Sequence, residues 1–478
     1  MFIYKNLMRN KGKKTELVRG LSLTAAVMIV AGSMIGSGIF RKPATMAGQL
    51  GSPELLLVVW IVAGIMTFIA ALVNSEVSGM IDATGGQYVY FRKMYGDGFA
   101  FIYGWSILSV IQTGSQAAIA YVFGEYLGYF IKYPLLPADW SNFSVFMPFV
   151  GNIHPFMEFG PKAVAILCII FLTLINYIGV IFGGLVQTII TFIKIGSMLV
   201  LSLLLFASGS GSLSNLNGSF SIPHESLNGF IAMIGLALSG AFWAYDGWNN
   251  VTFVAGEIKE PQRNVPKALL YGTLIVMGLY ILMNVAYLYI LPVDVMAKSP
   301  LVAAEAAQEI FGPAGAAVIS IAVIISTFGA LNGSILASAR VQFAMAKDNL
   351  FFNVLGKVHP RFGTPHTSLL LQGFWSAVLV LSGSFDTITD YVIFATWLFY
   401  MLGSVGVIVL RKKMPGTPRP YKVWGYPVVP AIFIIFSFLF LVNSLISDSR
   451  DAAMGLILIL LGLPFYIYWK YFAKKKPG

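Results

Sequence analysis

Glycine and serine interrupt the first long apolar stretch of the chain, where a membrane helix would otherwise be continuous. Gly32, Gly36 and Gly38 alternate with Ser33 and Ser37 over residues 32–38. These residue types weaken a helix, and the backbone groups that a break frees need partners because lipid offers none. A bound small molecule could supply those partners, so the stretch is a candidate binding site.

A second apolar stretch carries a similar interruption, SGAFWAYDGWN at residues 239–249. It has glycine near both ends and an acidic residue, Asp246, between them. When the apolar segments are numbered along the chain, the two breaks fall in segments 1 and 6, each the first in a block of five. Broken helices at corresponding positions of two halves indicate an inverted repeat with a binding site near the membrane midplane.

The ends of such half-helices suit the two charged groups of an α-amino acid. A half-helix N-terminus presents free N–H groups and the positive end of the helix dipole, which favour a carboxylate. Ser37 and Gly38 are placed to offer these N–H groups. A half-helix C-terminus presents free carbonyls, which favour an ammonium group, and Met34 with Phe242 or Trp243 could supply them.

Composition places both breaks inside an all-α, polytopic membrane protein. Apolar residues make up 57% of the 478 residues and charged residues only 11%, with a mean hydropathy of +0.79, whereas a soluble domain carries about 25% charged residues. A spanning helix needs roughly 20 apolar residues. We therefore predict twelve transmembrane helices, at 20–47, 53–80, 97–131, 162–180, 184–208, 227–255, 265–291, 312–346, 367–383, 386–411, 427–448 and 452–473.

Charge and spacing predict the orientation and the organisation of the chain. Most of the 31 Lys and Arg residues fall on the side of the two termini, which predicts a multi-pass protein of the cell membrane with both termini cytoplasmic. The first apolar run is too long for a secretory signal, so no cleaved peptide is expected. We predict a basic tail, two five-helix repeats of inverted topology, and helices 11 and 12 outside them, at 1–19, 20–208, 227–411 and 427–473.

The two breaks resemble those of the amino acid–polyamine–organocation superfamily, and within it the L-type amino acid transporter family. The resemblance rests on GSGIF at 36–40, FWAYDGWN at 242–249 and GEIKEPQRNVP at 256–266, and it extends over nearly the whole chain. It implies amino acid transport by alternating access in a five-plus-five inverted-repeat fold.

The resemblance also implies a substrate site. The substrate carboxylate would bind at Ser37 and Gly38, and its ammonium at the carbonyls of Met34, Trp243 and Asp246. The complete set of predicted substrate-binding residues is Met34, Ile35, Gly36, Ser37, Gly38, Phe242, Trp243, Asp246 and Asn249.

Lys194 lies well inside the fifth apolar segment, where a buried lysine is costly. One interpretation is that it bonds free carbonyls and holds helices together. The other, which the resemblance supports, is that its ammonium takes the place of a sodium ion and reaches the first break and Ser326 or Thr327 in segment 8. A permanently charged lysine favours obligatory exchange, whereas one that releases a proton would allow symport.

Other side chains near the breaks have both a functional and a structural interpretation. The resemblance makes Trp243 a gate over the substrate, and its size favours small substrates; ordinary packing is the alternative. Asp246 either caps the second half-helix or meets a cationic substrate. Tyr280 either faces the same centre or packs among aromatic residues. Ser115 and Gln116 either line the pocket or mediate helix contacts.

Enzyme and channel functions find little support in the sequence. The four histidines fall in predicted loops without metal-ligand spacing, and the glycine-rich segments lie in apolar helices rather than after strands. We therefore expect no catalytic residues, metal, cofactor or nucleic-acid partner. An ion channel should show repeated filter sequences or rings of charge, and neither is present.

The cysteine count bears on partners. Some relatives join a single-span glycoprotein through a disulfide in the loop after helix 3, but loop 132–161 has no cysteine here, and the single Cys168 lies in an apolar segment. We expect no disulfide-linked heavy subunit; the partners are the amino acid and membrane lipid, and a homodimer through helices 11 and 12 stays open. The sequence thus predicts sodium-independent exchange of small neutral L-amino acids. Proton-coupled symport and transport of cationic amino acids or polyamines are the alternatives.

Overall fold

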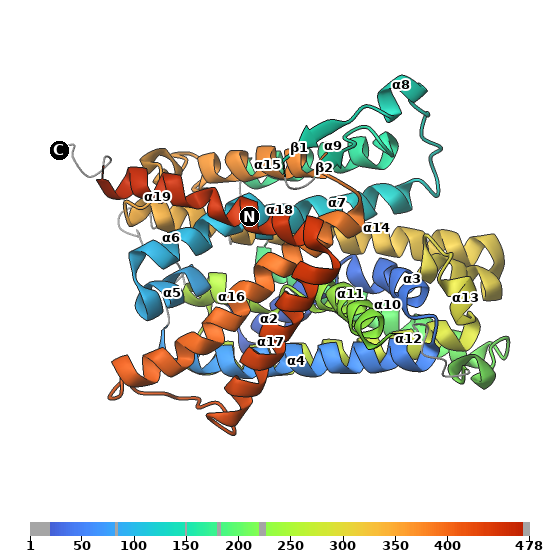
Figure 1. Cartoon of the computed structure of the whole chain (residues 1–478), viewed down its shortest axis with the longest axis horizontal. Helices are drawn as coiled ribbons and strands as arrows, with labels where there is room; N and C mark the ends of the chain where they lie inside the picture. Colours follow the sequence, from blue (N-terminus) through green and yellow to red (C-terminus); the bar gives the residue numbers. More distant parts are fainter. Residues whose placement is uncertain (1–19, 82–84, 149–150, 179–182, 219–225, 472–478) are drawn as a thin grey trace, which may run out of the picture.

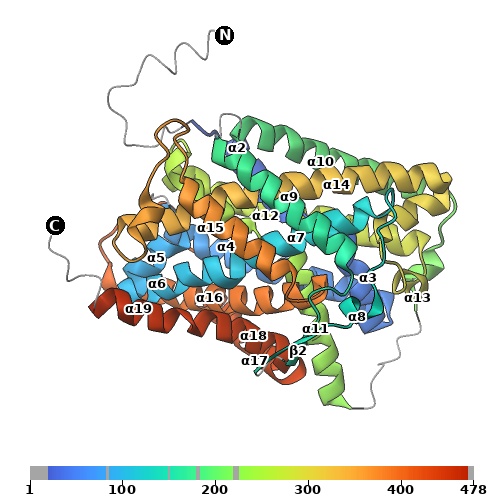
Figure 2. The same ribbon diagram turned by 90° about the horizontal axis from the view of Figure 1, so that it is seen from above.

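The computed structural model describes residues 20–81, 85–148, 151–178, 183–218 and 226–471, and these are almost entirely helical. The predicted tail at 1–19 lies outside the described residues. Most of the long helices run along the longest axis of the molecule (Figure 1), and α10 and α17 lie at opposite edges of the bundle when it is seen from above (Figure 2).

The helices of the bundle match the predicted apolar segments closely. They are α2 Leu23–Met34, α3 Gly38–Leu50, α4 Pro53–Met80, α5 Gln87–Tyr95, α6 Asp97–Ser106, the π-helix η1 Ile107–Ile111, α7 Gln112–Leu127, α9 Phe159–Ile178, α10 Gly183–Ala207, α11 Leu227–Tyr245, the 3-10 helix η3 Trp248–Glu257, α12 Pro261–Ile290, α14 Val302–Lys347, α15 His366–Val380, α16 Phe385–Lys413, α17 Val428–Ser447, α18 Ser449–Leu460 and α19 Gly462–Tyr471. The short elements are α8 Ala138–Ser141, β1 Val145–Met147, β2 Gly151–Ile153, η2 Leu213–Leu216, α13 Val293–Met296 and η4 Asn353–Gly356. β1 and β2 pair antiparallel, with Val145 opposite Ile153.

Among the described residues, 11 helical segments are long and apolar enough to cross a membrane, which confirms the all-α membrane class. The predicted span at 367–383 corresponds to α15, which has 15 residues, fewer than the roughly 20 that a span needs. The count of twelve and the inverted repeat therefore stay predictions. The helix that contains the predicted span 312–346 begins earlier, at Val302, and bends at Gly312, where φ is 61° and Pro313 follows.

Serine begins several of these helices. Ser22, Ser52, Ser226 and Ser384 each accept a hydrogen bond from a backbone N–H in the first turn of α2, α4, α11 and α16, which satisfies one of the donors that a helix start leaves free. Ser37 precedes α3 in the same way but makes no side-chain cap. The start of α3 therefore lacks the side-chain acceptor that a serine provides at the other four starts.

The burial of the helices places the centre of the bundle. The most apolar window of α6–η1–α7 is 89% buried, whereas that of α17 is only 28% buried and that of α10 33%. Large apolar side chains of α17, such as Ile435 and Phe438, are exposed, as expected of a helix that faces lipid or another subunit. The two broken helices pack against each other and against α4 and α12.

Candidate functional site

The first predicted break lies between α2 and α3. α2 ends at Met34, where the N–H of Ile35 donates to Ala31 O at 2.8 Å, and α3 begins at Gly38. Among the described residues, nothing accepts a hydrogen bond from the N–H groups of Ser37 and Gly38. The break thus exposes the donor end of one half-helix.

The second predicted break lies between α11 and η3. α11 ends at Tyr245, Asp246 is extended, and Gly247 adopts a left-handed conformation with φ of 93° before η3 begins. Glycine takes this conformation at no steric cost. A Cβ at Gly247 would also lie 2.8 Å from Ser33 O, so both the turn and the close approach of α2 require glycine here.

The two breaks lie against each other, as their matched positions in the sequence predicted. A side chain at Gly38 would collide with the backbone of Ala244 in α11. The indole N–H of Trp243 donates to the Ser37 hydroxyl at 3.3 Å. The small residues of the first break therefore bring α3 into direct contact with the end of α11.

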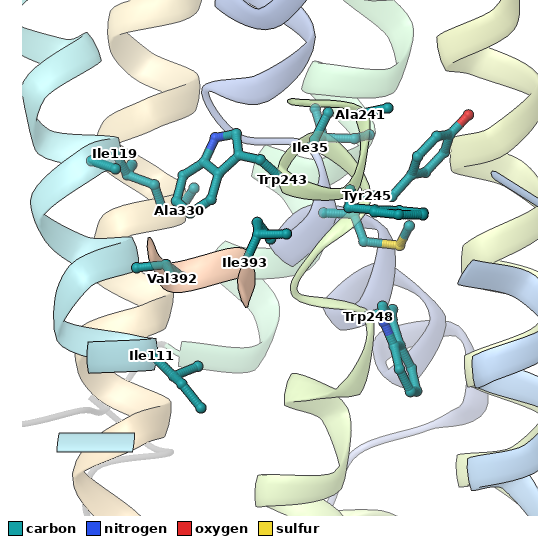
Figure 3. Packing of buried hydrophobic residues seen from close by; sticks show 14 of the residues in the cluster. Ile35, Ile111, Ile119, Ala241, Trp243, Tyr245, Trp248, Ala330, Val392 and Ile393 are labelled. Carbon is teal, nitrogen blue, oxygen red and sulfur yellow. The ribbon is translucent and has the colours of Figure 1, made fainter. Parts of the chain in front are cut away.

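A cavity of about 470 Å³ lies at the two breaks. Its walls come from both breaks and from the buried helices α7 and α14. Trp243 lies beside Ile119 of α7 and Ala330 of α14 (Figure 3). The lining residues are Ser33, Met34, Gly36, Ser37, Gly38, Gln112, Ser115, Ile119, Trp243, Asp246, Gly247, Asn250, Ala330 and Ser334.

Lys194 reaches the first break from α10. Its side chain is buried, with the residue only 4% exposed, and its ammonium donates to Ile35 O at 2.8 Å and to Gly32 O at 3.4 Å. These are carbonyls that the end of α2 leaves free. No carboxylate of the described residues forms an ion pair with Lys194, so its bonds run to the backbone.

The two hydroxyls predicted beside Lys194 behave differently. Ser326 lines a second cavity with Lys194, and its hydroxyl has no partner among the described residues. The Thr327 hydroxyl donates to Val323 O at 2.8 Å within its own helix. Ser326 therefore shares a space with Lys194, whereas Thr327 does not face that space through its hydroxyl.

Tyr280 supports the first break from α12 rather than lining the cavity. Its buried hydroxyl donates to Met34 O at 2.8 Å. Met34 O is a predicted acceptor for a substrate ammonium. One of its two lone pairs is thus already occupied, and the other stays available for a substrate. Together, Lys194 and Tyr280 hold the carbonyl end of α2 while the donor end of α3 stays open.

The predicted residues of the second break divide between the cavity and its surroundings. Asp246 lines the cavity, and its carboxylate accepts the Tyr400 hydroxyl at 2.7 Å. The N-cap of η3 is Gly247, which makes no side-chain cap, but the Asp246 carboxylate accepts the N–H of Gly247, so the capping role of Asp246 remains a prediction. Trp243 O, another predicted acceptor, receives the N–H of Asp246 at 3.2 Å.

Phe242 and Asn249 lie away from the main cavity. The Phe242 ring packs against Trp397, with ring centroids 3.7 Å apart, and against Phe440. Asn249 lines a smaller neighbouring cavity, which Asp246 also borders. The buried side chain of Ile35 is absent from the cavity walls as well, so these residues contribute to the break through their backbone or their packing.

Sequence reasoning missed three polar residues of the cavity. The Gln112 amide donates to Asn250 Oδ1 at 3.2 Å, and the Ser334 hydroxyl donates to Gln112 Oε1 at 3.0 Å. Gln116 lies one turn further along α7 and does not line the cavity, but its amide donates to Ser338 at 3.0 Å and to the cavity residue Ser334 at 3.4 Å. The available signal was a pair of amide side chains four residues apart in an apolar helix, directly after the π-helix η1; π-bulges are frequent at functional sites.

Comparisons with known proteins identify the family of the chain. Residues 21–464 match the family model described as amino acid permease. The chain is 31% identical over 454 residues to the serine/threonine exchanger SteT of Bacillus subtilis (strain 168), covering 94% of this chain and 96% of that protein. It is 29% identical to the human b(0,+)-type amino acid transporter 1, covering 98% of this chain and 91% of that protein. It is 32% identical to the mouse large neutral amino acids transporter small subunit 2, covering 96% and 83%.

These matches confirm the resemblance drawn from the two breaks and agree with a membrane transporter rather than an enzyme. The chain belongs to the amino acid permease family.

Proposed function

We propose that this protein exchanges small neutral L-amino acids across the membrane without using sodium. The observation that carries the proposal is the cavity between the two breaks, where the free N–H groups of Ser37 and Gly38 meet the carbonyl ends of α2 and α11. The substrate carboxylate would accept those N–H groups, and its ammonium would donate to remaining lone pairs at Met34 and Trp243. The names of the relatives, which describe amino acid transporters and an exchanger, support this proposal.

The walls of the cavity favour small substrates that carry a hydroxyl group. Trp243, Ile119 and Ala330 limit the space beside the breaks (Figure 3). Polar groups beyond the two breaks come from amide and hydroxyl side chains, those of Gln112, Asn250, Ser115 and Ser334. Serine and threonine fit this chemistry, and the relative named a serine/threonine exchanger supports the assignment.

Lys194 is the proposed reason that sodium is not needed. Its ammonium binds Ile35 O and Gly32 O, where freed carbonyls would otherwise coordinate a small cation. A charge fixed to the protein cannot leave with the substrate, so it supports the break without coupling transport to an ion. Proton symport differs in one testable respect, because it requires Lys194 to release its proton in each cycle.

Transport of cationic substrates would depend on Asp246. Among the residues that the structure describes, it is the one acidic residue of the cavity wall, and its carboxylate already accepts a hydrogen bond from the Tyr400 hydroxyl at 2.7 Å. A lysine or arginine side chain would need a second interaction with that carboxylate. We therefore propose neutral amino acids as the substrates ahead of cationic ones. Competition by neutral and by cationic amino acids for uptake distinguishes the two proposals.

Two further parts of the proposal concern the setting of the protein. The distribution of Lys and Arg supports cytoplasmic termini in the cell membrane. The single cysteine, Cys168, is buried in α9, which supports a transporter without a disulfide-linked subunit.

Counterflow in liposomes tests the proposal. Purified protein is reconstituted, and uptake of radiolabelled L-serine is compared between empty vesicles and vesicles that contain unlabelled L-serine. Exchange predicts uptake only into loaded vesicles, with the same rate in sodium and choline buffers. Uptake into empty vesicles that rises with an inward proton gradient would instead establish symport, and inhibition by lysine rather than by alanine or threonine would establish a cationic substrate.

A further inference from the structure

Four carboxylates gather at the neighbouring ends of α16 and α18, apart from the substrate cavity. Asp386 and Asp390 lie in the first two turns of α16, and Asp448 and Asp451 lie at the start of α18. Lys42 of α3 is the cation beside them, with its ammonium 2.7 Å from Asp386 and 4.0 Å from Asp390. Four carboxyl groups thus lie near one ammonium group.

Three of these carboxylates have the geometry of a cation site. One oxygen from each of Asp390, Asp448 and Asp451 lies within 4.8 Å of the others. Ca²⁺ holds its oxygen ligands at about 2.3–2.6 Å, so two ligands of one ion are never more than about 5 Å apart. The three oxygens therefore fit around a single ion.

Two side chains at this place carry oxygen atoms without a hydrogen-bond partner in the described chain. Asp451 is only 8% exposed, and no hydrogen bond or ion pair joins its carboxylate to another described residue. The amide oxygen of Asn443 is also buried without a partner in the described chain, although its nitrogen donates to Ile231 O at 3.0 Å. A buried carboxylate without a hydrogen bond or a counter-charge is strongly disfavoured.

No salt bridge of the described chain reaches Asp448 or Asp451, because the nearby cations are bonded elsewhere. Lys42 is bonded to Asp386, and the guanidinium of Arg450 donates to Asn152 O at 2.6 Å. The Ser239 hydroxyl donates to Asp390 at 2.7 Å, which satisfies one oxygen of that carboxylate. The excess of acidic groups over bonded cations therefore remains at Asp448 and Asp451.

A cavity of about 270 Å³ opens at these residues. Oxygen-bearing side chains from three helices and the turn before α18 contribute to its walls, and they are Ser239, Asp390, Asn443, Ser444 and Asp448. Asp390 and Asp448 connect this cavity to the three-carboxylate cluster, whereas Asp451 is not among its lining residues. Oxygen ligands without nitrogen or sulfur are typical of calcium and magnesium sites.

We propose that Asp390, Asp448 and Asp451 bind a divalent cation, and that Ca²⁺ fits best. Calcium accepts irregular sets of carboxylate, amide and water oxygens, whereas magnesium requires a near-ideal octahedron. The ion joins α16 to the turn between α17 and α18. Through the bond between Asp390 and Ser239, it also fixes α11 less than two turns before the second break. The site is separate from the substrate cavity, and its test does not depend on the proposed function.

Thermal unfolding of the full-length protein tests the site. Protein in detergent is treated with a chelator, and its unfolding temperature is measured by intrinsic fluorescence as CaCl₂ is added. Saturating calcium should raise the unfolding temperature by about 2 °C or more, because a ligand that binds only the folded state stabilises it. Asp451→Asn should unfold at a higher temperature than wild type without calcium, since it removes a repulsive charge, and it should lose the calcium response.

Asp139→Asn is the matched control, because Asp139 is an exposed acid in α8, and this variant should keep the calcium response. Asp448→Asn repeats the test if the first variant fails to fold, and equilibrium dialysis with radioactive calcium measures binding directly. The proposal is wrong if calcium neither binds to nor stabilises the wild type. It is equally wrong if both cluster variants retain the response, or if magnesium at equal concentration stabilises as much as calcium and competes with it fully.

Discussion

Replacing Lys194 with methionine is expected to slow exchange by about 10- to 100-fold while the protein still folds. Methionine keeps an unbranched apolar stem but removes the ammonium that donates to Ile35 O at 2.8 Å and Gly32 O at 3.4 Å. Only the first distance is that of a strong charge-assisted bond. Such a bond contributes about 1.5–3 kcal/mol, and about 1.4 kcal/mol corresponds to a tenfold change in rate.

Lys162→Met provides a matched control. Lys162 is also buried, and its ammonium donates to two backbone carbonyls, His154 O at 3.1 Å and Pro155 O at 3.3 Å, but it lies at the start of α9 away from the breaks. Its loss should lower the unfolding temperature without a selective loss of exchange. The carbonyls freed in Lys194→Met could coordinate a small cation, so sodium or lithium should restore part of its activity.

The assay for both variants is L-serine counterflow in liposomes, paired with thermal unfolding of the same preparations. Wild-type exchange by Lys194→Met would refute the role of Lys194. An equal loss of exchange in Lys162→Met would show that any buried lysine of this kind matters only for folding.

The other predictions concern the cavity itself. Gly38→Ala should abolish serine binding, because the new Cβ collides with the backbone of α11, whereas Gly278→Ala, which has open space around it, should bind normally; equilibrium binding to purified protein measures both. Trp243→Phe removes the bond to the Ser37 hydroxyl and enlarges the cavity, so larger neutral amino acids should compete better for uptake; an unchanged inhibition profile would contradict the gate assignment. In Ser334→Ala, serine should inhibit uptake about threefold to tenfold less well relative to alanine, as expected for the loss of one hydrogen bond. Equal weakening of inhibition by both amino acids would show that the Ser334 hydroxyl does not contact the substrate side chain.

The helix breaks were predictable because their causes are local. Glycine and serine disfavour a helix wherever it packs, so the sequence alone locates the break before α3 to within a residue or two. The long apolar segments are predictable for the same reason, and the segment at 53–80 coincides with α4. Lys194 stood out because a charge inside an apolar segment is rare.

The residues that face the cavity were less predictable, because they depend on how each helix is rotated about its axis. Phe242 and Trp243 are neighbours in the sequence, yet one packs against Trp397 and the other lines the cavity. Gln112 and Ser334 lie far apart in the chain and meet only through the packing of α7 against α14. No periodicity in either helix distinguishes a polar residue that faces a ligand from one that bonds a neighbouring helix.

The unequal support of the first break gives a physical reason for exchange under the proposed function. The carbonyl end of α2 is held by Lys194 and Tyr280 whether or not substrate is present. The N–H groups of Ser37 and Gly38 have no such partner in the described chain.

Closing an empty site would remove water from these two donors, and each unsatisfied donor costs about 1–3 kcal/mol. A cost of about 2–6 kcal/mol for both makes the closed empty state at least about 30-fold rarer than a loaded one. A substrate carboxylate satisfies both donors, so the loaded protein crosses the closed state and the empty one does not.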